Sequence, residues 1–201
     1  MQVLFKNKDL AVIIKPVGLD SEKGVPDELK NAVGGEIFTV HRLDKNVSGI
    51  MVYARNKSAA AELSRAVIDG SMIKEYLALV HGDLPERGDW EDLLFKDSTK
   101  NKVFVVKRER RGVKSARLEF KKLRGGETSL AEIRLHTGRS HQIRVQFASR
   151  GFPLVGDGKY GAKDNLPYPM LFSFRITFPF KGKNMSFESK PQWFKEDKNE
   201  A

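Results

Sequence analysis

Short runs of β-branched and other apolar residues recur along the chain, and polar segments separate them. Most of these runs are too short for a helix and end at turn residues, so they predict strands. The predicted strands cover residues 10–14, 37–40, 50–54, 72–80, 102–107, 115–123, 130–135 and 171–180. Within residues 72–80 polar and apolar positions alternate, which places Lys74, Tyr76 and Ala78 on one face of that strand.

Two segments have apolar residues at helical spacing instead. Residues 57–69 carry an apolar face made of Ala59, Leu63, Ala66 and Val67. The second helix is expected to begin at Ser140, a candidate N-cap, and to end at Gly151. Ile143 and Phe147 would face the core in this helix, and Arg144 would lie beside that face.

The remaining polar stretches predict connections. Residues 20–35 are polar and rich in Gly, so we expect a mobile connection there, and residues 82–90 predict a turn-rich loop. The basic turn at residues 107–112 lies between two predicted strands and predicts a protruding hairpin. Pro179 predicts that the last strand lies at an edge or end of the sheet. The charged tail after Trp193 is expected to fray.

Strands outnumber helices and do not alternate regularly with them, which favours an α+β fold with a mostly antiparallel, mixed sheet and flanking helices and loops. The 201 residues can form one sizeable core, so we expect a single domain over residues 1–201. No apolar run approaches the roughly 20 residues that span a bilayer. The N-terminus lacks the pattern of a signal peptide, and cysteine is absent. A cytoplasmic protein without membrane contacts is the simplest interpretation.

The net charge of +10 and the pI of about 9.7 indicate a polyanionic partner. The charge is concentrated between residues 96 and 124, where 12 Lys and Arg accompany three acidic residues. A solvated surface is the ordinary explanation for a charged run, but this concentration favours a nucleic-acid surface.

Three segments carry polar side chains that packing does not require. They contain Arg42 and Asp44, then Lys74 and Tyr76, and finally Arg139, His141 and Arg144. A carboxylate that acts as a nucleophile must remain ionised, and a neighbouring cation favours the charged form. Arginine suits this task because it keeps its proton and binds a carboxylate with a planar fork. A tyrosine beside such a pair could stack on a planar base and take part in proton transfer.

Other arrangements of these residues are less favoured. Asp44 could simply cap a surface turn and pair with Arg42. His136, His141 and Asp157 could suggest a metal site, but two His five residues apart do not face each other on one helix or strand, so we expect no metal. A glycosidase would need a second carboxylate opposite Asp44, and the spacing selects neither Glu62 nor Asp157.

The polar segments resemble the motifs of the RluA-type family of RNA pseudouridine synthases, in the same order and over nearly the whole chain. The matching residues are His41-Arg-Leu-Asp44 with Ser48-Gly49, Lys74-Glu-Tyr76-Leu-Ala-Leu-Val-x-Gly82, Thr137-Gly-Arg-Ser-His-Gln-Ile-Arg144, Gly151-x-Pro-x-x-Gly-Asp157, Tyr160-Gly161, Lys15-Pro16, Lys96-Asp97 and Asn101-Lys102. The resemblance implies the catalytic fold of that family. One departure is Val47, where the family usually has Thr. The N-terminal S4 RNA-binding domain of many relatives is expected to be absent here.

The resemblance also implies a reaction without metal or organic cofactor. A uridine in RNA would become pseudouridine: the N1–C1′ bond breaks, the base turns, and a C5–C1′ bond forms. Asp44 would be the essential carboxylate, acting at ribose C1′ or at C6 of the base. Arg144 would hold Asp44 ionised, and Tyr76 would stack on the flipped uracil and serve in proton transfer. Arg42 would contact a phosphate or fill the gap that the flipped base leaves.

The partner implied is RNA, either transfer RNA or ribosomal RNA, and the protein is expected to act as a monomer. Further RNA contacts are expected from Lys74, Arg139, His141, Lys107, Arg108, Arg110 and Arg111. An RNA-binding or RNA-folding module without essential catalysis is the alternative. The intact Asp44 argues against that module, because a binder needs no carboxylate close to RNA phosphates.

Overall fold

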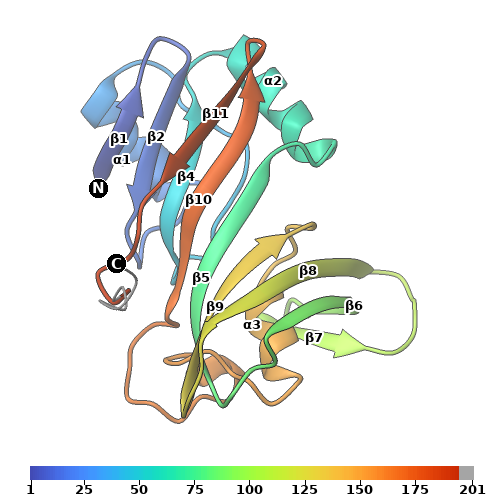
Figure 1. Ribbon diagram of the computed structural model, residues 1–201. Helices are drawn as coiled ribbons and strands as arrows, with labels where there is room; N and C mark the ends of the chain where they lie inside the picture. The colour runs from blue at the N-terminus through green and yellow to red at the C-terminus, as the bar shows by residue number, and fades with distance from the viewer. Residues whose placement is uncertain (195–201) are drawn as a thin grey trace.

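The computed structural model describes residues 1–194, and its strands join in one sheet with both antiparallel and parallel pairs (Figure 1). Only the pairing of β10 with β4 is parallel among the described strands, so the predicted α+β fold with a mostly antiparallel, mixed sheet is confirmed. The elements in chain order are β1 (Gln2–Lys6), β2 (Leu10–Lys15), α1 (Gly24–Val33), β3 (Phe38–Thr39), β4 (Ser48–Ala54), α2 (Lys57–Ile68), β5 (Ile73–His81), β6 (Arg87–Asp97), β7 (Lys102–Val106), β8 (Val113–Arg124), β9 (Thr128–Leu135), α3 (Gln142–Ala148), the 3₁₀ turn η1 (Gly158–Tyr160), β10 (Leu171–Phe180) and β11 (Lys183–Glu188).

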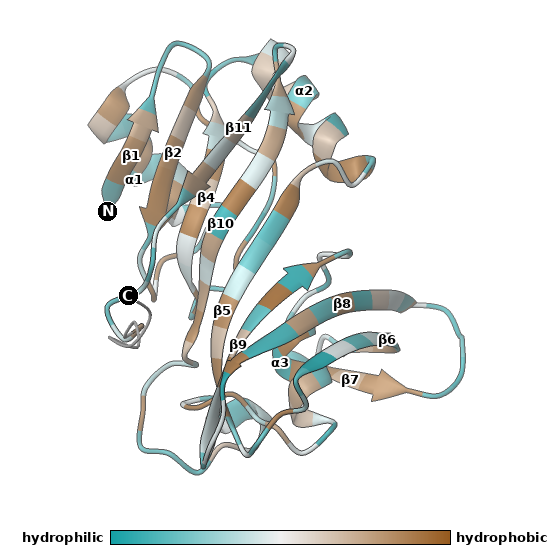
Figure 2. Cartoon of the chain, in the orientation of Figure 1, coloured by the Kyte–Doolittle hydropathy of each residue, from teal (hydrophilic) through white to brown (hydrophobic). Residues whose placement is uncertain are grey.

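The strand order is β1-β2-β4-β10-β5-β9-β8-β6-β7, with β3 added to β4 and β11 added to β10. Strands β6, β7 and β8 therefore form one end of the sheet and curl away from β1 and β2 (Figure 1). Figure 2 shows β2 as hydrophobic along its length, whereas β6 and β8 carry many hydrophilic positions. The sheet is thus most apolar at the end where helices cover both faces.

Alternation along the strands divides the core between the two faces of the sheet. Ala11 and Ile13 of β2 belong to a buried cluster that also contains residues of α1 and α3. Leu10 and Val12, one step away, belong to a second cluster with α2. The helix predicted over residues 57–69 is confirmed as α2, and the side chain of Asn56 caps it by accepting from the Ala59 N–H.

The expectation of a mobile connection at residues 20–35 is wrong, because α1 lies within it. The helix buries Val25 and Leu29, one turn apart, against the sheet. This i, i+4 pair is the apolar signal that the polar composition of the segment concealed.

The predicted hairpin of residues 102–107 and 115–123 is also wrong, since β7 and β8 do not pair with each other. Both pair with β6, which lies between them and includes part of the stretch expected to be a loop. Gly88 lies within β6, and glycine suits the position because a Cβ there would lie 2.1 Å from the Phe120 ring. The basic segment thus belongs to a three-stranded arm, β8-β6-β7.

Two further expectations need correction. Strand β10 is not an edge strand: it lies between β4 and β5, and Pro179 is tolerated because it lies past Thr177, the last residue in register with β5. Helix α3 begins at Gln142 rather than at a Ser140 cap, and it ends before Gly151. The part of the charged tail at residues 195–201 lies outside the described residues.

Gly49 marks the closest approach of β4 to β10 and yields a stability prediction. Its φ is +136°, and a Cβ would lie 2.4 Å from the Ser173 backbone N. We expect Gly49→Ala to lower the free energy of unfolding by about 2–4 kcal/mol, through overpacking against backbone and backbone strain. Urea denaturation followed by circular dichroism measures this loss.

Gly70→Ala is the matched control for this substitution. Gly70 also has a positive φ, of +79°, but no atom lies within 4 Å of its Cβ position. Only backbone strain of about 1–2 kcal/mol is expected there. Equal losses in the two variants would show that the close approach to Ser173 does not matter.

Candidate active site

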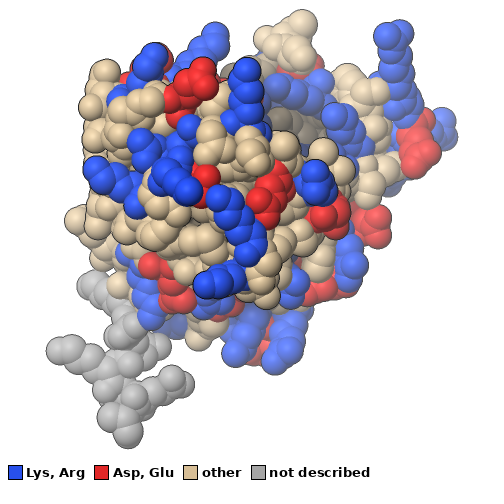
Figure 3. Space-filling model, turned by 90° about the horizontal axis from the view of Figure 1, so that it is seen from above, with Lys and Arg blue, Asp and Glu red and all other residues tan. Residues whose placement is uncertain are grey.

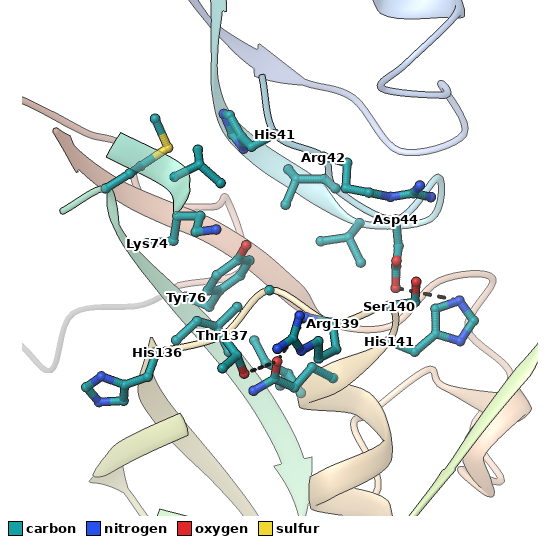
Figure 4. Close-up of a pocket in the computed structure, with 18 of the residues that line it drawn as sticks. His41, Arg42, Asp44, Lys74, Tyr76, His136, Thr137, Arg139, Ser140 and His141 are labelled. Atoms are coloured by element: carbon teal, nitrogen blue, oxygen red, sulfur yellow. Dashed lines mark hydrogen bonds and ion pairs between the residues drawn. The ribbon is translucent and has the colours of Figure 1, made fainter. Parts of the chain in front are cut away.

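The segments that sequence analysis selected line one cavity of about 910 Å³. Its walls come from the loop at residues 39–44, the start of β5, and the segment that joins β9 to α3. Figure 4 shows Asp44 and His141 at one end, Lys74 and His41 at the other, and Tyr76 between them. Groups distant in sequence are therefore brought to a single concave site.

Arg144 is the central cation of this site, and two carboxylates share it. Its Nε and Nη2 donate to the two oxygens of Asp157 at 2.7 and 2.8 Å, and its Nη1 donates to Asp44 Oδ2 at 3.2 Å. The Asp157 side chain is 1% exposed, and that of Asp44 is 18% exposed. Burial alone would lower the pKa of Arg144, but its bonds to Asp157 and the two negative charges raise that pKa overall.

Local bonding within the segment before α3 places Arg144. Gln142 folds back so that its Oε1 accepts from the Arg139 N–H at 3.0 Å and from Thr137 Oγ1 at 2.8 Å. Thr137 Oγ1 in turn accepts from the Arg117 N–H of β8. These bonds tie the segment before α3, and the first residue of the helix, to β8. Phe147, fully buried one turn further, fixes which side of the helix faces the core.

Lys15, the last residue of β2, holds the loop that carries Asp44 through hydrogen bonds to backbone carbonyl groups. Lys15 is fully buried, and its Nζ donates to the carbonyl oxygens of Pro16, Leu19 and Lys45 at 2.8–3.2 Å. Ser21 Oγ adds a bond to the Leu43 carbonyl at 2.9 Å. Burial lowers the pKa of Lys15 to about 8, although the charges of Asp44 and Asp20 oppose the shift. The backbone on both sides of Asp44 is therefore fixed before any substrate arrives.

Tyr76 and Lys74 lie two residues apart on β5 and both face the cavity (Figure 4). Tyr76 is 5% exposed, and its burial, together with the charge of Asp44, raises the pKa of the phenol. Burial lowers the pKa of Lys74. No described residue forms a hydrogen bond or ion pair with the Lys74 ammonium group, and Gly138 leaves room for it. An unpaired cation in a cavity wall is suited to an anionic ligand.

His41 stabilises the backbone of the loop and contributes no charge to it at neutral pH. Its Nε2 accepts from the backbone N–H of Val52, so the imidazole continues the pairing that β3 makes with β4. Burial and the nearby charge of Lys74 lower the pKa of His41 to about 3. This histidine is therefore neutral at neutral pH.

A family model described as RNA pseudouridylate synthase matches residues 3–149. An uncharacterized RNA pseudouridine synthase of Aquifex aeolicus is 32% identical over 97% of this chain, which spans 71% of the relative. The dual-specificity RNA pseudouridine synthase RluA of Yersinia pestis is 34% identical over 80% of this chain and 82% of the relative. The chain belongs to the RNA pseudouridylate synthase family. The RluA-type resemblance is thereby confirmed, and membership makes the chain an isomerase that acts on RNA.

Solved structures show the same fold. Human RNA Pseudouridylate Synthase Domain Containing 1 superposes with a TM-score of 0.84, at 23% identity, over 96% of this chain and 84% of that one. The chain spans 59% of an uncharacterized RNA pseudouridine synthase of Bacillus subtilis, so some relatives are considerably longer. None of the described helices is both long and apolar enough to cross a membrane.

Several predicted site residues lie away from Asp44. Arg42 forms an ion pair with Glu22 at 2.6 Å, and both side chains are about half exposed, so Arg42 does not pair with Asp44 as a surface turn would require. Arg139 is exposed, and its Nε donates to the Ser115 carbonyl at 2.8 Å. The basic turn residues are exposed at the end of the β8-β6-β7 arm, namely Lys107, Arg108, Arg110 and Arg111.

The alternative chemistries find no support in this synthase fold. His136 pairs with Glu119 at 3.0 Å, and both oxygens of Asp157 are bound by Arg144, so no metal site forms from them. For a glycosidase, Glu62 lies on α2, where it accepts from the Lys181 N–H. Apart from Asp44, the only carboxylate among the described cavity-lining residues is Glu22, which Arg42 already engages.

Sequence analysis missed three residues that build this site. Lys15 and Tyr160 appeared only as parts of matching motifs, and Asp157 only as a candidate metal ligand or acid. Tyr160 accepts from the backbone N–H of Val103 at 2.9 Å and contacts His141 Nδ1 at 2.8 Å. The signal for Asp157 was a carboxylate in an apolar stretch, next to Val155, in need of a buried cation.

The shared guanidinium predicts unequal effects for its two carboxylates. Asp157→Asn should lower the free energy of unfolding by about 3–5 kcal/mol, because it removes a buried charge that holds Arg144 at two points. Asp44→Asn removes only the charge of a more exposed partner, bound once, so a change within about 1 kcal/mol is expected. Urea denaturation of both variants tests this contrast, and equal losses would contradict the assignment of Asp157 as the anchor.

Proposed function

We propose that this chain converts specific uridines of a structured RNA, transfer RNA or ribosomal RNA, to pseudouridine, with Asp44 as the essential carboxylate. The observation that carries the proposal is the bond from Arg144 Nη1 to Asp44 Oδ2 at 3.2 Å, in a cavity that Tyr76 also lines. We further propose that the protein acts as a monomer in the cytoplasm, without metal or organic cofactor. The cavity of about 910 Å³ is large enough to admit a flipped nucleotide.

The reaction requires the glycosidic bond to break and a carbon–carbon bond to form. Asp44 would attack either ribose C1′ or C6 of the base, and the bond from Arg144 Nη1 holds its carboxylate in place for this step. In either route, N1 leaves C1′, the uracil turns within the cavity, and C5 bonds to C1′. The bond from Asp44 to C1′ or C6 breaks again, C5 loses its proton to a base, and N1 takes up a proton, so the product is an isomer of the uridine. The enclosing walls would hold the detached base close to the ribose during this turn.

Tyr76 and Lys74 would receive the nucleotide beside Asp44. The Tyr76 ring offers a stacking surface, and its raised pKa means that any role in proton transfer begins from the protonated phenol. Lys74, which has no partner among the described residues, is suited to a phosphate of the same strand, and Arg139 and His141 line other parts of the cavity. Arg42 is exposed at the cavity and would leave its ion pair with Glu22 to contact an RNA phosphate, because a surface ion pair is weak.

The basic arm would supply the wider RNA surface. Acidic residues of β6 and the preceding loop neutralise part of its charge: Arg117 pairs with Asp89, and Lys122 pairs with Asp83 and Glu86. Within the described chain, the four cations of the basic turn form no such ion pair, although Arg110 stacks on the Phe95 ring at 4.4 Å. In the view of Figure 3, Lys and Arg are spread over the face seen from above, with Asp and Glu among them and other residues between.

The first test replaces the carboxylate. Asp44→Asn should lower pseudouridine formation by a factor of about 10⁴ or more, because the amide is not a nucleophile, while RNA affinity stays within about twofold. Total RNA from cells with and without the gene, mapped with a chemical label that stops reverse transcription at pseudouridine, identifies the substrate for this assay. Normal turnover by the Asn variant would refute the mechanism. Unchanged RNA maps together with retained RNA binding would favour the binding module.

The second test concerns the basic turn. Replacing Lys107, Arg108, Arg110 and Arg111 by Gln should weaken RNA binding and reduce the slope of log K against log salt by about 0.7–0.9 for each phosphate that the arm no longer neutralises. Fluorescence anisotropy at several salt concentrations measures the slope. The control replaces four exposed lysines elsewhere, Lys6, Lys8, Lys30 and Lys183, and so matches the charge change. The same slope in both variants would place the RNA outside the arm.

A further inference from the structure

The Tyr160 hydroxyl connects β7 to the catalytic end of the cavity. Its oxygen accepts from the Val103 backbone N–H at 2.9 Å and lies 2.8 Å from His141 Nδ1. Burial raises the pKa of Tyr160 to about 12, so the phenol keeps its proton at neutral pH. A backbone amide can only donate, so among the described partners of the Tyr160 hydroxyl His141 Nδ1 is the one that can accept its O–H proton.

This arrangement favours one tautomer of His141. When Nδ1 accepts a hydrogen bond, the proton of a neutral imidazole resides on Nε2. Burial lowers the pKa of His141, with further lowering by Arg144 and Lys159, against the opposing charges of Asp44 and Asp157. The ring is thus neutral near pH 7 and carries an N–H at Nε2.

His141 Nε2 lies 3.8 Å from Asp44 Oδ2, the same oxygen that receives the bond from Arg144. No described residue forms a hydrogen bond with Asp44 Oδ1. The two oxygens therefore have different surroundings: cationic and N–H donors face Oδ2, and Oδ1 is free for a substrate.

We propose that Tyr160 is a positioning residue that acts through His141. Its hydroxyl fixes the tautomer that presents Nε2–H to Asp44 Oδ2, which leaves Oδ1 as the reacting atom. The opposite tautomer would present a lone pair of Nε2 to the carboxylate and repel it. This inference deepens the proposed function, because it rests on the role of Asp44 in the reaction.

A direct test observes the tautomer without RNA. The chain has four His, and ¹⁵N-labelled histidine spectra of the protein and of His141→Gln identify the signals of His141. At pH 7.5 we expect the Nε2–H tautomer in the unmodified protein and a mixture of tautomers in Tyr160→Phe. The Nδ1–H tautomer in the unmodified protein would refute the proposal whatever the activity, and the proposed reaction would be unaffected by that result.

A kinetic test then asks whether the tautomer matters. Tyr160→Phe keeps the ring, over which the Arg144 guanidinium lies at 5.1 Å and the Lys102 ammonium at 5.2 Å, and removes only the hydroxyl. We expect kcat at pH 7.5 to fall about 10-fold, with the RNA KM little changed.

The pH dependence separates positioning from a structural defect. Below the pKa of His141, both ring nitrogens carry protons, so Nε2–H again faces Asp44 even without Tyr160. The ratio of variant to unmodified kcat should therefore rise toward one as the pH falls below the pKa of His141, which burial lowers from the ordinary imidazole value. A ratio that stays constant with pH would refute the proposal. The control, Tyr168→Phe, removes the hydroxyl of a tyrosine that is 37% exposed and should match the unmodified enzyme throughout.

Discussion

A buried guanidinium constrains this structure more than any other single group. Arg144 keeps its proton under all ordinary conditions, so its place in the core obliges the fold to supply carboxylates there. Both carboxylate oxygens of Asp157 accept hydrogen bonds from Arg144, and these bonds fix the loop before η1 against α3. The Nη1 group of the guanidinium is then turned toward Asp44. The position of the proposed nucleophile thus depends on the buried pair of Arg144 and Asp157.

The Asp44 loop is rigid for a separate reason. Lys15 and Ser21 donate hydrogen bonds to its backbone carbonyl groups. At the start of the loop, the His41 ring accepts a backbone N–H of β4 that a neighbouring strand would otherwise bind. None of these residues needs to touch a substrate to be important. The site therefore combines the Asp44 carboxylate, which Arg144 and its own loop hold in place, with a cavity whose other end carries Lys74, unpaired among the described residues. Preorganisation of this kind reduces the rearrangement needed when RNA binds.

Local pattern was sufficient for the strands of the core and for α2, because short apolar runs and helical spacing report burial directly. It failed for α1, where the residues around Val25 are polar, and for β6, where Gly88 lies within the strand. Both segments resemble loops in composition. For the site, residue chemistry selected Asp44, Tyr76 and Arg144 as candidates. Their convergence, and the role of Asp157 as anchor, depends on contacts between residues far apart in sequence, such as the hundred positions that separate Asp44 from Arg144. Periodicity does not carry that information.

The central place of β10 has a consequence for biosynthesis. Residues 171–180 fill the gap between β4 and β5, so a nascent chain on the ribosome cannot close its sheet until nearly the whole described sequence has been translated. Until then, the apolar edges of β4 and β5 are exposed to other chains. The two parts of the sheet that β10 joins can therefore associate only after residues 171–180 have been made, and chaperone binding to the growing chain would protect those two strand edges until then.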